Sequence, residues 1–241
     1  MNAELKATPG PRDPHQRLRL GVTGGLMLAV VLAGFFFAAL ESVVSRLGIE
    51  QLDAPASHFV AAHQTAVLTN VAKVVTVLGS PVLTVAVAVV ALVLLIWRLH
   101  WVEAAVFLAI AVAGGDLSYV VLKHLVHRAR PPGALVHLST FSFPSGHTVG
   151  ATTLYLGLAW IISRRHASRP VRVAAWAGAV LIAVAVGATR IVLGVHYASD
   201  VIGGFALGAF WVVAAATAWG AYELSRPPRR PARVTIDTQT R

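Results

Sequence analysis

The arrangement of apolar residues limits the fold of this chain more than any other feature of its sequence. Blocks close to the ~20 residues that a helix needs to cross a bilayer recur at about 20–40, 81–97, 101–123, 146–162, 172–189 and 200–222. Hydrophobic residues make up 56% of the 241 positions and charged residues only 12%, which is poor material for a soluble surface. We therefore expect an all-α integral membrane bundle of six transmembrane helices.

The segments between and around these blocks predict the rest of the architecture. Residues 41–79 carry too many charged residues and histidines for a lipid-exposed span, and we expect a loop followed by an additional amphipathic helix, about 56–78, before the second span. We interpret 1–19 as a flexible cytoplasmic segment, 20–224 as the membrane domain and 225–241 as a basic cytoplasmic tail. The block at 20–40 is longer than the core of a secretory signal, which favours a span over a signal peptide.

The 20 lysines and arginines are distributed unevenly over the two sides of this topology. Fourteen fall in the two termini and in the loops after the second and fourth spans, which the positive-inside rule makes cytoplasmic. The six on the opposite side are Arg46, Lys73, Lys123, Arg128, Arg130 and Arg190. Four of the six lie in or next to the loops after the third and fifth spans. Topology alone would deplete cations there, so the presence of these four indicates a chemical reason. Since the other cations serve topology, the net charge of +10 does not call for nucleic acid as a partner.

Three segments at outward helix ends combine these cations with histidines and a carboxylate. They are Lys123 to Arg130-Pro131, then Pro144-Ser145-Gly146-His147, then Thr189-Arg190 followed by His196 and Asp200. Lys123, Arg130 and Arg190 suit a phosphate dianion, because fixed cations in a partly desolvated cleft stabilise the charge on its oxygens. Ser145 lies where a helix N-cap belongs, so the backbone N–H groups that follow it would point at the same anion. The pattern predicts a phosphate site.

Two histidines and one carboxylate make this site reactive. His196 and Asp200 are four residues apart, so they share a face if the sixth helix extends back that far, and the carboxylate can then hold the imidazole tautomer. We expect His196 to form a phosphohistidine, while His147 protonates the leaving alkoxide and later activates water. A zinc site is the competing interpretation, but neighbouring permanent cations would repel the ion, and we expect neither a metal nor a cofactor.

With these residues, the sequence resembles the type 2 phosphatidic acid phosphatase family, in its membrane-bound lipid phosphatase branch. The resemblance rests on ten positions, which are Lys123, Arg130, Pro131, Pro144, Ser145, Gly146, His147, Arg190, His196 and Asp200. It implies catalytic roles for His196, His147 and Asp200. It implies that substrate is bound by Lys123, Arg130, Ser145, Gly146 and Arg190. Thr189 departs from the family, which usually has serine there, but it keeps the hydroxyl group.

These features together predict a membrane lipid phosphatase whose site faces the extracellular or periplasmic side. An isoprenoid diphosphate carrier is the favoured substrate, since carrier diphosphate is released on that side, and phosphatidic acid or phosphatidylglycerophosphate comes next. A lipid-linked phosphotransferase would use the same pocket, and a transporter would also place charges among membrane helices. The haloperoxidase branch of the superfamily is the less suitable comparison, because its known members resemble soluble proteins. The oligomeric state stays open.

Other residues suit less specific interpretations. We expect interfacial placement for five residues outside the ten positions, namely His58, His63, His124, His127 and Arg128. Asp116, inside the third span, either supports the site or belongs to a structural pair within the bundle. Gly204 and Gly208 form a pair of small residues one helical turn apart, which favours close packing within the bundle over dimerisation.

Overall fold

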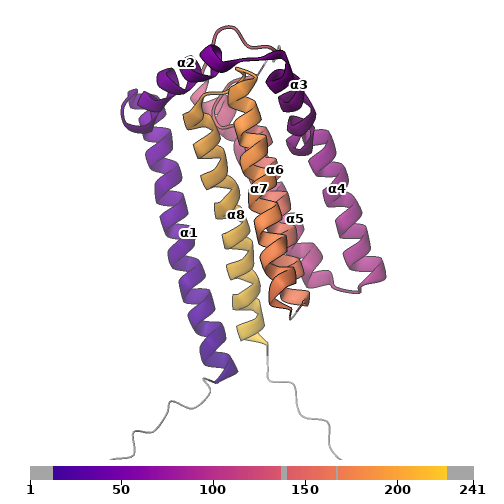
Figure 1. The fold of residues 1–241 in the computed structure, drawn as a ribbon. Helices are drawn as coiled ribbons and strands as arrows, with labels where there is room; N and C mark the ends of the chain where they lie inside the picture. Colours follow the sequence, from indigo (N-terminus) through magenta and orange to yellow (C-terminus); the bar gives the residue numbers. More distant parts are fainter. Residues whose placement is uncertain (1–12, 137–139, 167, 227–241) are drawn as a thin grey trace, which may run out of the picture.

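The computed structural model describes residues 13–136, 140–166 and 168–226, and within them it is entirely helical (Figure 1). The bundle consists of α1 (Pro14–Ser45), α4 (Pro81–Val93), α5 (Val102–Val126), α6 (Gly146–Arg165), α7 (Arg169–Val192) and α8 (Ala198–Ser225). The shorter elements are η1 (Gly48–Leu52), α2 (Asp53–His63), α3 (Ala66–Val75), η2 (Thr76–Gly79) and the π turn η3 (Leu94–Arg98). Both described ends of the chain lie at one end of the bundle.

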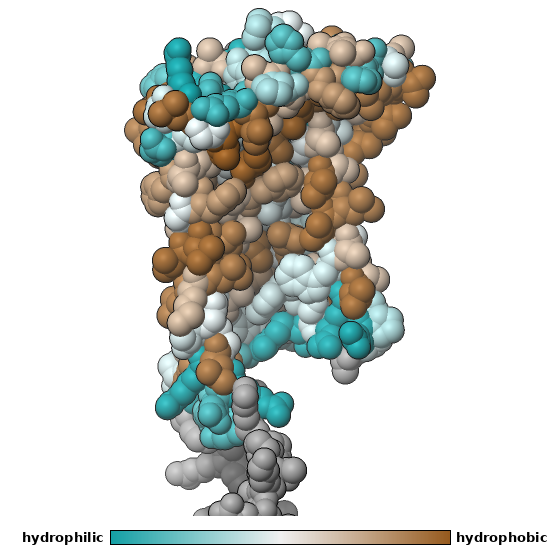
Figure 2. Space-filling view, turned by 60° about the vertical axis from the view of Figure 1, so that its left-hand side comes forward, coloured by the Kyte–Doolittle hydropathy of each residue, from teal (hydrophilic) through white to brown (hydrophobic). Residues whose placement is uncertain are grey.

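The long helices have the length and composition of membrane spans. Five segments of the described chain qualify, which are His15–Ser45, Ala66–Arg98, Val102–Val126, Arg169–Val192 and Ala198–Ser225. The sixth long helix, α6, packs against α5, α7 and α8, and many of the residues that it buries are threonine, glycine or alanine. Figure 2 shows a hydrophobic band between two hydrophilic ends. The predicted all-α membrane bundle is confirmed, and α6 is less apolar because it lies among other helices.

The segment before the second span differs from the single amphipathic helix that the sequence predicts over 56–78. The structure has two helices there, because the extended backbone at Gln64 ends α2, and Thr65 Oγ1 caps α3 by accepting the N–H of Leu68 at 3.1 Å. Helix α2 lies across the end of the bundle, whereas α3 leads through η2 into α4 (Figure 1).

The terminal segments are described only in part. Helix α1 begins at Pro14, with Asp13 as its N-cap, inside the segment for which we predict a flexible lead. The remainder of that lead, 1–12, and the basic tail from 227 onward lie outside the described residues.

Two glycines let α8 lie close to α6. A Cβ atom on Gly204 would lie 2.9 Å from the Cβ of Thr148 and 3.0 Å from the carbonyl oxygen of Ser145, and Gly208 meets α6 in the same way one turn deeper. The glycine pair therefore serves close packing within the bundle, as predicted. The contact brings the N-terminus of α6 beside that of α8, where the Ser145 N–H donates to the Asp200 carbonyl oxygen at 3.1 Å.

Candidate active site

The structure brings all eight predicted site residues to the end of the bundle away from the described termini (Figure 1). Lys123 lies in the last turn of α5 and Arg130 in the loop after it. Ser145, Gly146 and His147 lie at the start of α6, Arg190 lies in the last turn of α7, and His196 and Asp200 lie around the start of α8. Residues 137–139 of the loop between α5 and α6 are outside the described part.

A tight turn after α7 places His196. The helix ends at Val192, and Gly194 then adopts a φ of +65°, in the left-handed region that favours glycine. The chain reverses so that the His196 N–H donates to the carbonyl oxygen of Arg190 at 3.3 Å. The five residues between Arg190 and His196 form this reversal, which holds the backbone of His196 against the last turn of α7.

His196 contacts Asp200 without sharing a helix with it. Helix α8 begins at Ala198, so the idea that it extends back to His196 is wrong. Asp200 lies in the first turn of α8, where its Oδ2 accepts the N–H of Tyr197 at 2.9 Å and lies 3.3 Å from His196 Nδ1. The capping geometry holds the carboxylate against the ring, which favours the tautomer with the proton on Nδ1 and a lone pair on Nε2.

Arg130 faces that second nitrogen. Its Nη1 lies 3.2 Å from His196 Nε2, and its Nη2 donates to the Phe141 carbonyl oxygen at 3.2 Å. Lys123 Nζ donates to the same carbonyl oxygen, so the two cations meet over one acceptor. Nε2 of His196 therefore lies beside Arg130, with Lys123 within electrostatic range of the same ring.

Arg190 is buried and keeps unused hydrogen-bonding capacity. Its Nη1 donates to Thr76 Oγ1 at 2.7 Å, whereas the buried Nε has no hydrogen-bond partner among the described residues. The residue is only 3% exposed. A buried N–H group without an acceptor is unfavourable, typically by about 1–3 kcal/mol, and an anion would relieve this. The orphan donor is therefore available to a ligand that can accept a hydrogen bond.

The start of α6 forms the third side of the site. Ser145 is the N-cap of α6, as predicted, although its Oγ accepts from Thr148 Oγ1 at 3.0 Å and not from a backbone N–H. A Cβ at Gly146 would lie 2.9 Å from the ring of Tyr119, so the position favours glycine. His147 is half-buried. Its ring lies within electrostatic range of Arg190, His196, Arg130 and Lys123.

Burial sets the charge state of His196. Its pKa is lowered to about 4, first by burial and also by Lys123 and Arg130, against the opposing hydrogen bond and charge of Asp200. Burial also lowers the pKa of Arg130. The imidazole is therefore neutral near pH 7, which is the state in which Nε2 can act as a nucleophile.

A buried ion-pair network behind Asp200 was not predicted from the sequence. The side chain of Arg128 is only 11% exposed, and it bridges two carboxylates: Nη1 donates to Asp200 Oδ1 at 2.5 Å and Nη2 to Asp53 Oδ2 at 2.6 Å. Interfacial placement of Arg128 is therefore wrong. Asp53 also accepts the N–H of Ser199 at 2.8 Å and its Oγ at 2.6 Å, and Ser142 Oγ donates to Asp200.

This network joins three elements and keeps Arg128 charged. Burial by itself would lower the pKa of Arg128, but Asp200 and Asp53 raise it on balance. Asp53 lies at the start of α2, 75 positions from Arg128, so no local spacing indicates the pair. The one sequence feature that could have indicated this pair is Asp53 itself, because an acidic residue in an interfacial segment needs a cation if it becomes buried.

Asp116 and four histidines make no hydrogen bond to the predicted site residues within the part of the chain that the structure describes, although the rings of His124 and His127 pack against Phe141. Asp116 is half-buried in α5 and has no hydrogen-bond or ion-pair partner in the described chain. The exposed side chains of His58, His63, His124 and His127 are consistent with interfacial placement. Where side chains are described, no group of three or more histidine, aspartate or glutamate residues is arranged to hold a metal ion.

Comparison with known proteins decides the family. The model of the PAP2 superfamily matches residues 104–223, which contain every predicted site residue. The fold superposes on the crystal structure of a transmembrane PAP2 type phosphatidylglycerolphosphate phosphatase from Bacillus subtilis with a TM-score of 0.71 at 27% identity, covering 84% of this chain and 98% of that one. The chain belongs to the PAP2 superfamily. The resemblance based on the ten positions is thereby confirmed.

Other PAP2 relatives extend the comparison. The chain is 41% identical over 109 residues to phosphatidylglycerophosphatase B of Bacillus subtilis, covering 42% of this chain and 51% of that protein. It is 33% identical over 122 residues to lipid A 1-phosphatase of Rhizobium johnstonii, covering 46% and 45%. The chain thus spans about half the length of these curated relatives. The crystal structure of Aquifex aeolicus LpxE shares the fold, with a TM-score of 0.55 at 22% identity over 68% of this chain and 94% of that one.

Proposed function

We propose that this membrane protein is a lipid phosphatase that transfers a phosphoryl group from a lipid to water through His196. The observation that carries the proposal is the meeting of a neutral, buried imidazole with Arg130 at its Nε2. The orphan Nε belongs to Arg190, which lies within electrostatic range of Arg130 and His147. Fixed cations bind a phosphate dianion, and they stabilise the charge that spreads over its oxygens in the transition state. The pocket therefore suits phosphoryl transfer to a nitrogen nucleophile.

The reaction proceeds in two steps. His196 Nε2 attacks phosphorus, so a P–N bond forms and the P–O bond to the lipid breaks, while His147 donates a proton to the leaving oxygen. Asp200 accepts the Nδ1–H of His196 and stabilises the positive charge on the ring. Water then loses a proton to His147 and attacks phosphorus, and the P–N bond breaks to release inorganic phosphate. The cations take the part that a metal ion plays in other phosphatases, so we expect no metal requirement.

Arg128 and Asp53 act through Asp200 as positioning residues. One oxygen of Asp200 faces His196 and the N-terminal turn of α8, and the other receives Arg128 Nη1. Ser199 Oγ accepts from the same Nη1 and donates to Asp53, and Asp53 accepts from Nη2 of the guanidinium. The carboxylate of Asp200 therefore cannot rotate without breaking several buried bonds. The network therefore keeps the imidazole oriented toward the phosphate.

The relatives and the topology suggest the substrate and its location. Two relatives are named for phosphatidylglycerophosphate and lipid A 1-phosphate, so we place phosphatidylglycerophosphate first. An isoprenoid diphosphate carrier comes second, because the cation distribution puts the site on the extracellular or periplasmic face and both termini in the cytoplasm. Phosphatidic acid is the third candidate.

Purified protein in detergent with EDTA tests the proposal. We expect phosphate release from at least one of these three lipids to exceed release from a soluble phosphate ester, and His196→Ala to abolish it. Acid-quench labelling from phosphate-labelled lipid should give a base-stable, acid-labile label that His196→Ala lacks. His63→Ala is the matched control, because that histidine is exposed, it contacts Phe59 and none of the described site residues, and its loss should leave rate and label unchanged.

Three outcomes would contradict parts of the proposal. Preference for the soluble ester would contradict the lipid substrate. Full activity of His196→Ala would contradict the nucleophile and favour a transport function. Phosphate recovered on an added lipid or sugar acceptor instead of in solution would indicate a phosphotransferase that uses the same pocket.

A further inference from the structure

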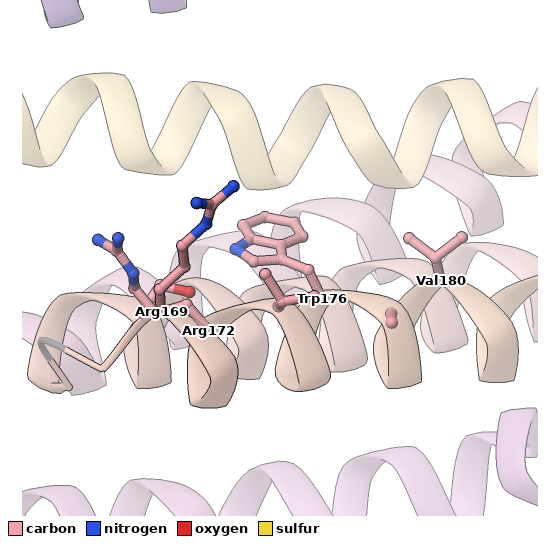
Figure 3. A pocket seen from close by; sticks show the side chains of 7 residues that line it. Arg169, Arg172, Trp176 and Val180 are labelled. Atoms are coloured by element: carbon pink, nitrogen blue, oxygen red, sulfur yellow. The ribbon is translucent and has the colours of Figure 1, made fainter.

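An open groove lies at the other end of the bundle, far from the candidate active site. It has a volume of about 660 Å³ and is lined by Ser163 of α6 and by one face of α7. Figure 3 shows Arg169, Arg172, Trp176 and Val180 projecting from the same side of α7, with both guanidinium groups near the start of the helix and Val180 farther along it. The groove is thus charged at the end near the start of α7 and apolar toward the middle of the membrane.

The two arginines lack acidic partners. Neither the Arg169 nor the Arg172 side chain makes a hydrogen bond or ion pair within the described chain. The carboxylates nearby are engaged elsewhere, since Glu223 pairs with Arg164 at 2.6 Å and Glu103 with Arg226 at 2.9 Å. The charge of this pair is therefore not neutralised by the described protein.

The start of α7 adds to this positive charge. Its first turn contains no acidic residue, and its N-cap Ser168 makes no side-chain capping bond. The partial positive charge of the helix N-terminus consequently adds to that of Arg169 and Arg172. Two cations at the positive end of a helix are unfavourable without an anion, so the arrangement favours a negatively charged ligand.

The apolar part of the groove offers space for acyl chains. Val173, Ala177 and Val180 continue the stripe along α7, and Val180 is 49% exposed. A second cavity, of about 360 Å³, shares Trp176 with the groove and extends past Trp160 between α1, α6 and α8. It exists because α1 packs against α8 and α7 packs against α6, which leaves a gap between α1 and α7. The groove and this cavity therefore meet at Trp176, and each has an apolar part, although Arg164 and Glu223 also line the cavity.

We infer that this groove binds an anionic phospholipid of the leaflet on the side of the chain termini. The headgroup phosphate lies between Arg169 and Arg172, whose planar forks match phosphate oxygens, and Trp176 lies at the level where aromatic side chains contact headgroups. One acyl chain follows α7 and the other enters the cavity beside Trp160. A zwitterionic headgroup would bring its own cation to the two arginines, so the groove selects a net negative charge. In the proposed topology this leaflet is cytoplasmic, the side whose anionic lipids attract basic segments.

Quenching by brominated lipids tests this inference. The full chain is placed in phosphatidylcholine nanodiscs that contain the same small share of either brominated phosphatidylglycerol or brominated phosphatidylcholine. The fluorescence difference between wild type and Trp176→Phe isolates the signal of Trp176. Each arginine near anionic lipid contributes roughly a fivefold preference, so we expect brominated phosphatidylglycerol to be enriched about 30-fold at most and to quench Trp176 several-fold more strongly.

Matched variants separate the groove from general surface charge. Arg169→Gln/Arg172→Gln should abolish the preference, whereas Arg98→Gln, which removes an exposed cation at the same end of the bundle but outside the groove, should preserve it. All three positions are exposed, so the variants should elute like wild type in gel filtration. Equal quenching by the two brominated lipids in wild type would overturn the inference. So would an unchanged preference in the double variant, or its loss in Arg98→Gln.

Discussion

Replacing Gly204 by alanine adds one methyl group where α8 packs closely against the start of α6, near the candidate site. The new Cβ would lie 2.9 Å from the Cβ of Thr148 and 3.0 Å from the carbonyl oxygen of Ser145. Non-bonded carbon atoms prefer about 3.5–4.0 Å, so the helices must separate by roughly 0.5–1 Å. Ser145 is the N-cap of α6, whose start forms one side of the candidate site, so this separation would displace part of the site.

The size of the effect follows from two opposing contributions. Overpacking of this kind costs about 1–3 kcal/mol, and the higher helix propensity of alanine returns up to about 1 kcal/mol. We therefore expect Gly204→Ala to lower the free energy of unfolding by about 1–2 kcal/mol. Gly208→Ala should lower it at least as much, because its Cβ would lie 2.6 Å from the Cβ of Thr152. At Gly178 in α7 no atom lies within 4 Å of an added Cβ, so Gly178→Ala is the matched control.

Unfolding by sodium dodecyl sulfate in mixed micelles measures the stability difference, and phosphate release measures kcat. Since a displacement of about 1 Å can lower a rate by up to ~100-fold, we expect kcat of Gly204→Ala to fall by about tenfold or more. Gly208→Ala should lose stability with a smaller loss of kcat, because it lies one turn farther from Ser145. Gly178→Ala should match wild type or exceed it in stability. The reasoning is refuted if Gly204→Ala is as stable and as active as Gly178→Ala.

Three further predictions use the same assays. Arg128→Gln leaves two buried carboxylates without their cation, so stability should fall by about 3–5 kcal/mol and kcat should fall with it. Arg128→Lys should recover part of both. Wild-type stability and kcat in Arg128→Gln would contradict the positioning role. With the pKa of His196 lowered to about 4, kcat/KM should show no acid limb from this group between pH 7 and 5, and a limb near pH 6.5 that belongs to His196 would contradict its burial. Because the folded pKa lies below the unfolded value of about 6.5, the stability contribution of His196 is complete above that pH and is lost as the pH falls toward 4. Asp116→Leu removes a half-buried carboxyl group that has no hydrogen-bond or ion-pair partner in the described chain, so activity should be unchanged and stability equal or higher. A large loss of kcat would place Asp116 in the site.

The membrane bundle could be predicted from the sequence because its cause is local. An apolar block of about 20 residues must satisfy its own backbone hydrogen bonds inside a bilayer, and the α-helix does this within one segment. The residue types of the candidate site could be predicted from the sequence for a related reason. Lys123, Arg190 and His196 lie at the ends of apolar helices, where charged groups are costly and usually functional.

The positions of the helix boundaries were less predictable. The break between α2 and α3 depends on the backbone at Gln64 and on a single capping bond from Thr65, which the apolar pattern does not record. Because α8 begins at Ala198, His196 lies in the turn before the helix. His196 still contacts Asp200, because a carboxylate in the first turn of a helix points back toward the chain that precedes the helix.

What the sequence by itself determined was the chemical inventory: a membrane-spanning helical chain with cations, two histidines and an aspartate at helix ends on one side. Only the tertiary structure decided how these groups are held. Arg128 pairs with Asp53 across 75 positions, and the orphan Nε of Arg190 becomes apparent only when its neighbours are known. The reason is physical, since local sequence determines backbone preference and membrane insertion. The free energy of a buried charge instead depends on groups distant in the sequence, which come into contact with it only when the helices pack.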